Sequence, residues 1–565
     1  GKMGGIQMSE YIRLKEANCK NCYKCIRHCP AKSISFSGNQ AHIVSDECVL
    51  CGQCFIVCPQ NAKIIRDDSD KAKMLLSGNG PVFASIAPSF AAAFPGIGIA
   101  GMESALKKLG FFAVEETAIG ATIVKKQYEN LIEQGEQDII ISSCCPTVNL
   151  MIQKHFTEVL PYLAKVVSPM QAHCRDIKNR YPDAKTVFIG PCISKKYEAD
   201  EFSGEVDCVL TFDELSNWLR AEKIETAPQL DRIEKSRTRI FPTAGGILKS
   251  MERKSEEYSY LSVDGHENCI NTLRDISAGK ISKCFVEMSA CIGSCIGGPV
   301  TSKTRHNPVR DFIAVEKYSG IRDFDVKMPS ADRLSRIFES LEQLQKYPNE
   351  IQLNEILMKM GKKTPADELN CGSCGYNSCR EKAIAVFQGK ADLTMCTPFL
   401  RDKAETFSNN ILKNSPNGII VLNDVLEVQQ INPAALKMLN IRNASDIVGD
   451  NVVRILDPGV FMQVRKTGRS VRDNRVYLAE YKRYIEQTVI LDKTYRMLLC
   501  IMRDVTDEEN ERQKKEAISR QTIEITDKVV EKQMRVVQEI ASLLGETTAE
   551  TKVALTKLKE SLKDE

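Results

Sequence analysis

The chain has 565 residues, too many for one hydrophobic core, and this length indicates about three to five domains. Its 77 basic and 74 acidic residues nearly cancel, so the charge gives no reason to expect nucleic acid or an anionic membrane as a partner. No apolar run reaches the ~18 residues needed to cross a bilayer, and the first residues lack the apolar stretch of a secretion signal. We therefore expect a cytoplasmic location.

Cysteine is the informative residue type. There are 22 cysteines, and most of them fall in tight clusters. In a reducing compartment such clusters are metal ligands more often than disulfides. The sequence therefore predicts several metal centres.

Residues 9–66 contain one cysteine spacing twice. The first copy is Cys19, Cys22, Cys25 and Cys29, and the second is Cys48, Cys51, Cys54 and Cys58. Both copies read C-x2-C-x2-C-x3-C-P, the run of two-cluster bacterial ferredoxins, in which the fourth cysteine ligates the other cluster. We expect one [4Fe–4S] cluster on Cys19, Cys22, Cys25 and Cys58, and a second on Cys48, Cys51, Cys54 and Cys29. Zinc is the alternative, although zinc sites usually offer two CxxC pairs separated by a longer spacer.

Residues 75–355 alternate strand-like runs with amphipathic segments. The strand-like runs are 82–87, 138–142, 186–190 and 207–211. This alternation predicts an α/β domain with largely parallel sheets.

Three cysteine motifs lie far apart in this region. They are Ser-Ser-Cys-Cys-Pro at 142–146, Gly-Pro-Cys-Ile-Ser-Lys-Lys at 190–196, and a glycine-rich segment at 287–298 that contains Cys291 and Cys295. The first two follow strand-like runs, where α/β folds build their sites. Four of the thiolates, those of Cys145, Cys192, Cys291 and Cys295, could hold one iron–sulfur cubane. An isolated zinc ion or a purely structural cubane is the alternative at this point.

The three motifs resemble the H-cluster signatures of [FeFe]-hydrogenases, in the same order and with similar spacing, over residues ~9–355. The resemblance implies that Cys145, Cys192, Cys291 and Cys295 bind a [4Fe–4S] part. It implies that Cys295 also bridges to a diiron subsite carrying CO, CN and an azadithiolate, between two lobes. Lys195 matches the lysine that hydrogen-bonds a cyanide ligand, and Cys144 matches the cysteine that passes protons to the bridging amine.

The sequence departs from the family pattern along the proton route. Glu129 matches one relay glutamate, but Lys126 stands where an outer glutamate is expected and Ala164 where a relay serine is expected. Gly190 and Ser289 replace two methionines that flank the diiron site. Because alanine cannot carry a proton, we expect an altered exit or a slower proton step.

A second type of cysteine cluster lies in residues 365–400. Cys371, Cys374, Cys379 and Cys396 read C-x2-C-x4-C-x16-C, which resembles the small four-cysteine [4Fe–4S] domain of corrinoid iron–sulfur and electron-bifurcating complexes. It implies one additional [4Fe–4S] cluster, acting as a second electron port or as a link to the next domain; a zinc knuckle is the alternative. Cys174, Cys208, Cys269 and Cys284 have no partner spacing and are expected to be small buried hydrophobes.

Residues 405–506 resemble a PAS domain, with short strands and an Asp504-x-Thr506 exit into a helix. From 507 to 565 we expect a helical or coiled-coil tail, with Ile525, Val529 or Val530, Met534, Val537 and Leu544 on one stripe. Gly545 interrupts the stripe, and Leu555, Leu558 and Leu562 resume it.

The predicted fold class is multidomain α/β and α+β: a ferredoxin-like module, a two-lobed α/β H-cluster domain, a small four-cysteine iron–sulfur domain, a PAS domain and a C-terminal helix. The expected function is reversible H2 oxidation in an anaerobic cell, with hydrogenase maturation proteins, ferredoxin or a similar carrier, and a second copy of the chain as partners. The alternatives are a sensor of H2 or redox state with slow turnover, and a non-catalytic iron–sulfur assembly protein that lacks the diiron subsite.

Overall fold

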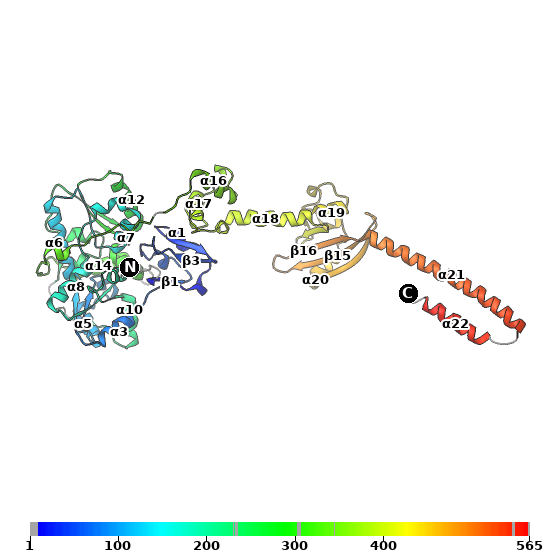
Figure 1. Cartoon of the computed structure of the whole chain (residues 1–565), viewed down its shortest axis with the longest axis horizontal. Coiled ribbons are helices and arrows are strands. Elements are labelled where there is room, and N and C mark those ends of the chain that lie inside the picture. The colour runs from blue at the N-terminus through cyan, green and yellow to red at the C-terminus, as the bar shows by residue number, and fades with distance from the viewer. Residues whose placement is uncertain are drawn as a thin grey trace, which may run out of the picture. The chain divides into compact units, whose positions relative to one another are not determined.

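The structure is a computed structural model that describes residues 10–229, 231, 235–301, 307–343, 345–544 and 548–562 (Figure 1). The chain divides into two compact units, one ending at Leu400 and one beginning at Arg401. The predicted start at residue 9 and the predicted interruption at Gly545 lie outside the described residues. The predicted multidomain α/β and α+β class is confirmed, as the following elements show.

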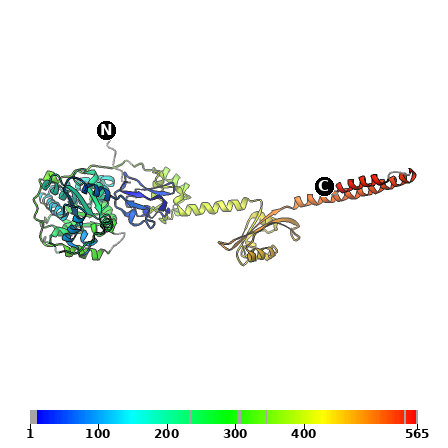
Figure 2. The same ribbon diagram turned by 90° about the horizontal axis from the view of Figure 1, so that it is seen from below.

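The ferredoxin-like module is built on two short antiparallel pairs, drawn in blue in Figures 1 and 2. Its elements are β1 (Ile12–Leu14) with β4 (Lys63–Ile65), β2 (Ile34–Ser37) with β3 (Gln40–Ile43), α1 (Lys24–Arg27) and α2 (Gln53–Ile56). The two cysteine copies share their backbone shape, because residues on both sides of the second cysteine have positive φ in each: Asn21, Tyr23, Leu50 and Gly52. Positive φ is uncommon for non-glycine residues, so the sequence repeat is also a structural repeat.

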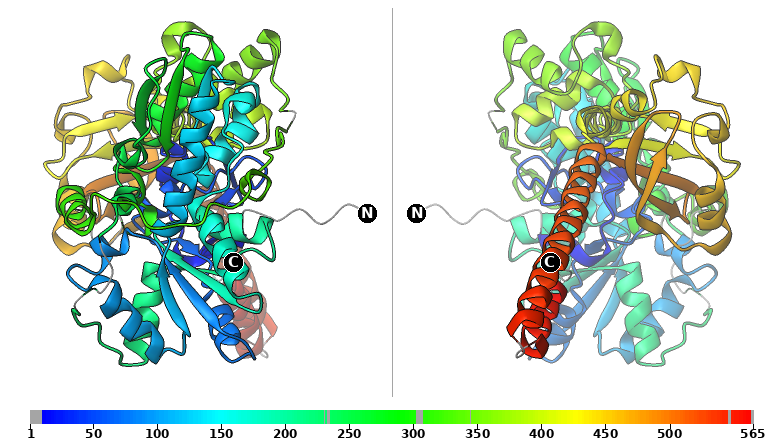
Figure 3. Two further views of the ribbon diagram at one scale, coloured as in Figure 1. Left: turned by 90° about the vertical axis from the view of Figure 1, so that its left-hand side faces the viewer. Right: turned by 90° about the vertical axis from the view of Figure 1, so that its right-hand side faces the viewer.

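The central domain has two parallel sheets in separate lobes. The first sheet has the order β6 (Ala113–Glu116), β5 (Val82–Ile86), β8 (Lys185–Gly190), β9 (Cys208–Thr211), and the second the order β10 (Ser259–Asp264), β11 (Cys284–Ser289), β7 (Ile139–Ile141). In Figure 3 the blue and green arrows of the two sheets occupy different parts of the domain. The predicted strands are confirmed to within two residues at either end, and the two lobes are as expected.

Helices cover both sheets, as a parallel sheet requires. They are α3 (Ser69–Leu76), α4 (Phe90–Ala93), α5 (Gly98–Lys108), α6 (Ala118–Gln134), α7 (Pro146–His155), α8 (Pro169–Arg180), α9 (Ser194–Glu201), α10 (Phe212–Ala221), α11 (Gly246–Ser250), α12 (His266–Ser277), α14 (Pro308–Tyr318) and α15 (Ala331–Leu334). Cys174, Cys208, Cys269 and Cys284 are all buried, in line with their expected role as small hydrophobes.

The four-cysteine region is helical. It contains α16 (Glu350–Lys359), α17 (Cys379–Phe387) and the beginning of α18 (Thr397–Asn414). Leu353, Leu357 and Met360 of the α16 segment pack with Ala383 of α17. Helix α16 therefore belongs with the four-cysteine region, although its first residues fall inside the range 75–355 expected for the central domain.

The second unit is built on a five-stranded antiparallel sheet. Its order is β13 (Val428–Ile431), β12 (Gly418–Leu422), β16 (Met497–Asp504), β15 (Arg483–Asp492), β14 (Val471–Leu478), with α19 (Pro433–Met438) and α20 (Gly459–Thr467) completing the core. This is the PAS-like architecture expected from the sequence. At its exit, the Thr506 hydroxyl donates to Asp504 and accepts the amide of Tyr484 at 3.0 Å, so the start of the next helix is bonded to β15.

The tail is a helical hairpin of α21 (Thr506–Leu544) and α22 (Thr548–Ser561), seen in Figure 2. The expected single stripe is wrong in part. Val530, Met534 and Val537 are half-buried, whereas Ile525 and Val529 are exposed. At 100° per residue the centres of the two sets lie about 125° apart around the helix, so they form two different faces. Among the described residues no helix has the length and apolar character to span a bilayer.

Candidate functional site: a thiol-lined cavity between two lobes

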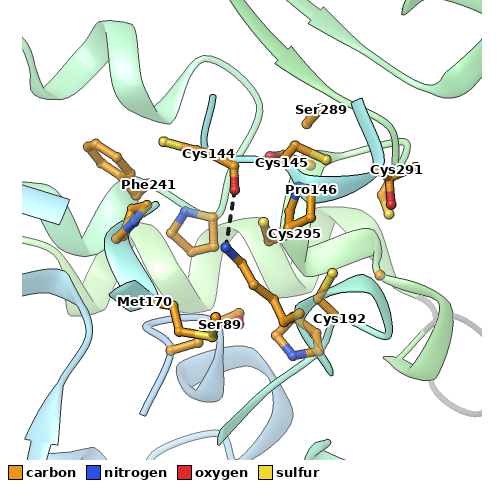
Figure 4. Close-up of a pocket in the computed structure, with 18 of the residues that line it drawn as sticks. Ser89, Cys144, Cys145, Pro146, Met170, Cys192, Phe241, Ser289, Cys291 and Cys295 are labelled. Atoms are coloured by element: carbon orange, nitrogen blue, oxygen red, sulfur yellow. Dashed lines mark hydrogen bonds between the residues drawn. The ribbon is translucent and has the colours of Figure 1, made fainter. Parts of the chain in front are cut away.

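Three loops at the carboxyl ends of strands bring the predicted cysteines together. Cys145 follows β7 and caps α7, Cys192 follows β8 ahead of α9, and Cys291 and Cys295 follow β11. All four line one cavity of about 120 Å³, together with Cys144 and Lys195. Figure 4 shows the labelled cysteines arriving from separate segments around one space. The geometry gathers residues that are up to 151 positions apart in the sequence, from Cys144 to Cys295.

Cys145, Cys192 and Cys291 are half-buried and Cys295 is exposed, and the four thiols are close enough to repel one another as thiolates. Burial raises the pKa of Cys145 and, to about 12, that of Cys295, and the charge of Cys192 adds to both effects. Such a group of thiolates needs a cation to neutralise it. In the described part of the chain, no three His, Cys, Asp or Glu side chains converge on a single ion. In a cubane each thiolate binds a different iron, so a quartet around a space fits that group.

Glycines shape the third loop tightly. A Cβ on Gly297 would lie 1.8 Å from the carbonyl oxygen of Ile292, and one on Gly298 would lie 2.9 Å from that of Pro191. Ser294 has a φ of 63°, an unusual value for a residue with a side chain. The backbone between Cys291 and Cys295 is therefore folded back on itself and brings both thiols to the cavity.

Lys195 reaches the cavity from the first turn of α9. Its Nζ donates to the Cys144 carbonyl at 3.3 Å, drawn as the dashed line in Figure 4, and to Glu198 at 2.6 Å. Glu198 is fully buried and also accepts from Arg336 at 2.6 Å and from Ser168 at 3.2 Å. This buried ion network therefore holds the Lys195 side chain in one orientation.

Cys144 precedes the predicted ligand Cys145 and makes different contacts. Its Sγ is 3.2 Å from the hydroxyl of Tyr128, which also accepts the amide of Ser143 at 2.9 Å. Burial raises the pKa of Cys144 to about 12, whereas the Tyr128 hydrogen bond and the Lys195 charge lower it. Burial also raises the pKa of Glu287, whose charge acts on Cys144, to about 7.

The residues that depart from the family pattern lie as follows. Glu129 is buried in an ion network, where it accepts the amide of Glu252 at 2.7 Å and faces Lys125 at 3.7 Å. Ala164 is fully buried and packs in the same apolar cluster as Tyr128. Lys126 is half-buried on α6.

Gly190 and Ser289 stand where methionines are expected in the family pattern, and their surroundings differ. A Cβ on Gly190 would lie 2.7 Å from the ring of Phe188, so that ring occupies the space a side chain would need. Ser289 lines the cavity at the end of β11. Met170 and Phe241 line it from other segments and supply apolar surface there (Figure 4).

In the ferredoxin-like module the second predicted quartet is gathered. Cys29, Cys48, Cys51 and Cys54 line a cavity of about 20 Å³. Burial raises the pKa of Cys25 to about 11, and the thiolates of Cys22 and Cys19 add to this effect, so three members of the first quartet are also close together. The fourth member, Cys58, accepts a hydrogen bond at its Sγ from the amide of Ala62 at 3.3 Å.

The second copy faces the thiol-lined cavity of the central domain. A Cβ on Gly52 would lie 2.6 Å from the Cβ of Pro299, which lines that cavity. The thiolate charge of Cys51 reaches Cys291, whose pKa burial raises well above the usual range. The two thiol groups are therefore neighbours across the module boundary.

The last cysteine cluster surrounds a buried cation. Lys382 is fully buried, and its Nζ donates to the Leu393 carbonyl at 3.1 Å. Burial lowers the pKa of Lys382, and the thiolates of Cys374, Cys396 and Cys379 oppose that shift. Cys371 is exposed, with its Sγ 3.3 Å from the Ser373 hydroxyl. Three of the four predicted ligands thus share one charged neighbourhood.

This cluster is bonded to the ferredoxin-like module. Arg27 donates to the carbonyl of Gly372 at 2.9 Å, and Lys32 donates to that of Gly375 at 3.3 Å. Lys390 pairs with Glu47 at 2.6 Å. The loop carrying Cys371 and Cys374 therefore rests directly on the first cysteine copy.

Sequence reasoning missed the residues that position the site: Tyr128, Glu198, Glu287, Arg336 and Lys382. A partial signal existed, because Glu198 follows Lys195 by three residues and Lys382 follows Cys379 by three, a spacing that brings helical side chains together. Arg336 carries no such signal, since its partner is 138 positions away.

Three parts of the chain match known protein families. Residues 11–73 match a 4Fe-4S dicluster domain, residues 80–299 match the iron only hydrogenase large subunit, C-terminal domain, and residues 367–398 match a putative Fe-S cluster family.

Individual relatives fall into two groups. The chain is 25% identical to the NADP-reducing hydrogenase subunit HndD of Solidesulfovibrio fructosivorans, over 46% of this chain and 56% of that protein. It is 29% identical to the cytosolic Fe-S cluster assembly factor NAR1 of Yarrowia lipolytica, over 35% of this chain and 47% of that protein. The chain thus spans about half the length of the curated relatives it matches. A solved structure of the [FeFe]-hydrogenase HydA(deltaEFG) aligns with 17% identity and a TM-score of 0.39, over 48% of this chain and 98% of that one.

Proposed function

We propose that the chain interconverts H2 with protons and electrons, because residues 80–299 match the C-terminal domain of the iron only hydrogenase large subunit. The observation that carries the proposal is one cavity lined by Cys145, Cys192, Cys291 and Cys295 and also by Cys144 and Lys195. The first four would hold a cubane, and Cys295 would also bridge to a diiron subsite. When bound, that H-cluster would supply the hydrogen-binding and redox chemistry.

The chain's own residues would have distinct tasks. Lys195, fixed by Glu198 and Arg336, would donate a hydrogen bond to an anionic ligand in the cavity. Cys144 would hold and release a proton at its Sγ, with the Tyr128 hydroxyl orienting that thiol. Glu287, with a pKa near 7, would exchange the proton with its surroundings at neutral pH. Glu129 would take part in proton transfer only after breaking its ion pair and hydrogen bond with Lys125 and the Glu252 amide.

Electrons would pass through the chain's own clusters. The proximity of the Cys51 and Cys291 thiol groups supports a route from the central cavity to the cluster on Cys29, Cys48, Cys51 and Cys54. The bonded four-cysteine region would add a branch to that route, and an external ferredoxin or similar carrier would complete it. Maturation proteins would deliver the diiron subsite in the cytoplasm.

One observation favours a second candidate, a sensor of H2 or redox state with slow turnover. Ala164 is fully buried where a relay hydroxyl is expected, and Glu129 is held by Lys125 and the Glu252 amide. A restricted proton route suits an occasional turnover that is read out by the PAS-like unit and its helix. The assembly-protein reading is weaker, because it gives Cys144 and Lys195 no task.

The tail supports a second copy of the chain as partner. Exposed apolar residues recur eleven positions apart along α21, with exposed fractions between 42% and 63%: Ile518, Val529 and Ile540 in one series, Ile525 and Val536 in the other. An eleven-residue repeat keeps a stripe on one side of a helix and is typical of helices that wind around one another in a right-handed supercoil. Val530, Met534 and Val537 on another face of α21 are half-buried, whereas this stripe is exposed and available to another chain.

Infrared spectroscopy after anaerobic maturation tests the main proposal. We expect bands from metal-bound CO and CN, their loss in Cys295→Ala, and their retention in Cys174→Ala, which removes a buried cysteine of the other lobe's core. Matured protein with no such bands and no hydrogen-isotope exchange with water would rule out the hydrogenase reading and leave the assembly-protein one. Strong turnover would favour the enzyme over the sensor.

A further inference from the structure

An open cavity of about 470 Å³ lies where three parts of the first unit meet. Its walls come from the first cysteine copy (Arg27, His28, Lys32), from α12 (His266, Glu267, Arg274) and from Asn377 of the four-cysteine region. We call this the basic groove. It shares no lining residue with the thiol-lined cavity between the lobes.

The groove carries an excess of positive charge. Arg27, Lys32 and Arg274 line it, against Glu267 as the acidic lining residue. The exposed Lys20 and Lys24 lie on the same copy, and Glu381 is the further acid whose charge reaches Lys32. The sequence from Asn18 to Ser45 contains no Asp or Glu, although acids and bases nearly balance over the whole chain.

The charge belongs to one copy of the repeat and not to the other. Between Cys48 and Cys58 there is no charged residue, and Val49 and Leu50 are buried. That copy packs against the central domain through Gly52. The first copy, with the same backbone shape, instead presents Lys24, Arg27 and His28 to solvent. A requirement of cluster binding would affect both copies alike. Arg27 and Lys32 also bond the four-cysteine loop, whereas Lys20 and Lys24 are exposed on the surface of the first copy and leave its positive charge open to a partner.

The groove also reaches a cluster site. Cys29 and Pro30 line it, and Cys29 is a member of the quartet with Cys48, Cys51 and Cys54. A molecule in the groove would therefore lie next to the cluster whose thiols neighbour Cys291. Of the thiol groups in the ferredoxin-like module, this is the one that faces both the central cavity and an open surface.

We propose that the basic groove docks a small electron-carrier protein with an acidic face, which exchanges one electron at a time with the cluster on Cys29, Cys48, Cys51 and Cys54. The proposal rests on the proposed function and adds the place and the charge of the partner. Complementary charge steers such a carrier and raises its association rate by about 10- to 1,000-fold over a neutral encounter. No bond is made or broken in the step: the carrier loses an electron and the cluster gains it, or the reverse.

The test uses the full chain with its clusters and a reduced, acidic two-[4Fe–4S] ferredoxin as the probe. Cluster reduction is followed by stopped-flow absorbance at 0.01 M and at 1 M salt, where the Debye length falls from about 30 Å to about 3 Å. The variant carries Lys24→Glu and Arg274→Glu. In the described part of the chain neither side chain makes an ion pair or hydrogen bond, so internal contacts are kept. Lys108→Glu on α5 is the matched control, with an exposed lysine outside the groove.

We expect the double variant to lower the second-order rate about tenfold or more at low salt and less than about twofold at high salt, with the control within about twofold of wild type. Equal losses in the control, or no loss in the variant, would overturn the docking site. Reduction by dithionite should be unchanged, and a fall there would also overturn it. Hydrogen turnover with a viologen dye is scored separately, so an inactive protein would refute the proposed function while the docking site is still tested.

Discussion

The electron side and the proton side of the thiol-lined cavity are built differently. On the electron side, thiol groups of separate modules face one another, as Cys51 and Cys291 do, and Gly52 permits close approach. On the proton side, Cys144 touches Tyr128, but the next positions are the buried Ala164 and the ion-paired Glu129. The chain therefore has closely placed sites for electron transfer and a restricted route for protons. That combination suits slow turnover.

The sharpest way to separate the two sides is Cys51→Ser. Serine oxygen is a poor iron ligand, so we expect carrier-linked turnover to fall about a thousandfold while exchange of H2 with D2O, which needs no net electron flow, stays within about threefold. The matched change Cys22→Ser, in the exposed first copy, should lower turnover only about tenfold. Isotope exchange by mass spectrometry and carrier-linked assays give both numbers. Loss of exchange in Cys51→Ser would show that the two sides are not separable.

On the proton side, Tyr128→Phe removes the hydroxyl beside Cys144. We expect exchange and turnover to fall together by about 10- to 100-fold, because both need the same proton. Tyr258→Phe, which changes another buried tyrosine of the same apolar cluster, should stay within about twofold. A fall in turnover without a fall in exchange would place Tyr128 on the electron side instead.

On the proton side, Glu287 should make the stability of the protein depend on pH. Its pKa is raised to about 7 by burial, so between about pH 4.5 and 7 the unfolded chain has lost the proton and the folded chain keeps it. The free energy of unfolding should therefore fall as pH rises through this window, by about 3 kcal/mol in wild type relative to Glu287→Gln. Denaturant unfolding of both proteins at several pH values measures the difference. Parallel pH profiles would show that the carboxyl does not titrate in this range.

The smallest effect on hydrogen chemistry is expected from the tail. Ile525→Glu with Val529→Glu places charge on the exposed stripe, so we expect the chain to become monomeric in sedimentation equilibrium. Hydrogen-isotope exchange should change less than about twofold, since these residues lie in the other unit. Arg520→Glu, an exposed position on another side of the same helix that makes the same change in charge, is the control. A wild-type protein that is itself monomeric would contradict the proposed pairing.

Much of this organisation could be predicted from local patterns. The cysteine runs, the strands that precede Cys145 and Cys192, and the Asp504-x-Thr506 exit each depend on residues close in sequence. Short-range spacing fixes which thiols can share a cluster. The ligand assignments themselves remain predictions.

Contacts between distant segments could not be predicted in the same way. Arg336 reaches Glu198, and the four-cysteine loop rests on Arg27, only because the tertiary fold brings them together. Three-to-four spacing predicts one apolar face on α21, but it does not specify the position of each residue around the helix axis. Two different faces, one holding Val530 and one holding Val529, give nearly the same count of apolar residues.

The left-handed backbone at Gly52 limits how the duplicated ferredoxin-like module can be recombined. The equivalent position of the other copy is Tyr23, whose φ of 54° shows that a side chain is tolerated there. At Gly52 a single carbon would already collide with Pro299. Swapping the two halves, or replacing one by a duplicate of the other, would therefore break the fit even though every iron ligand survived. The two halves share a backbone shape and are nevertheless not interchangeable.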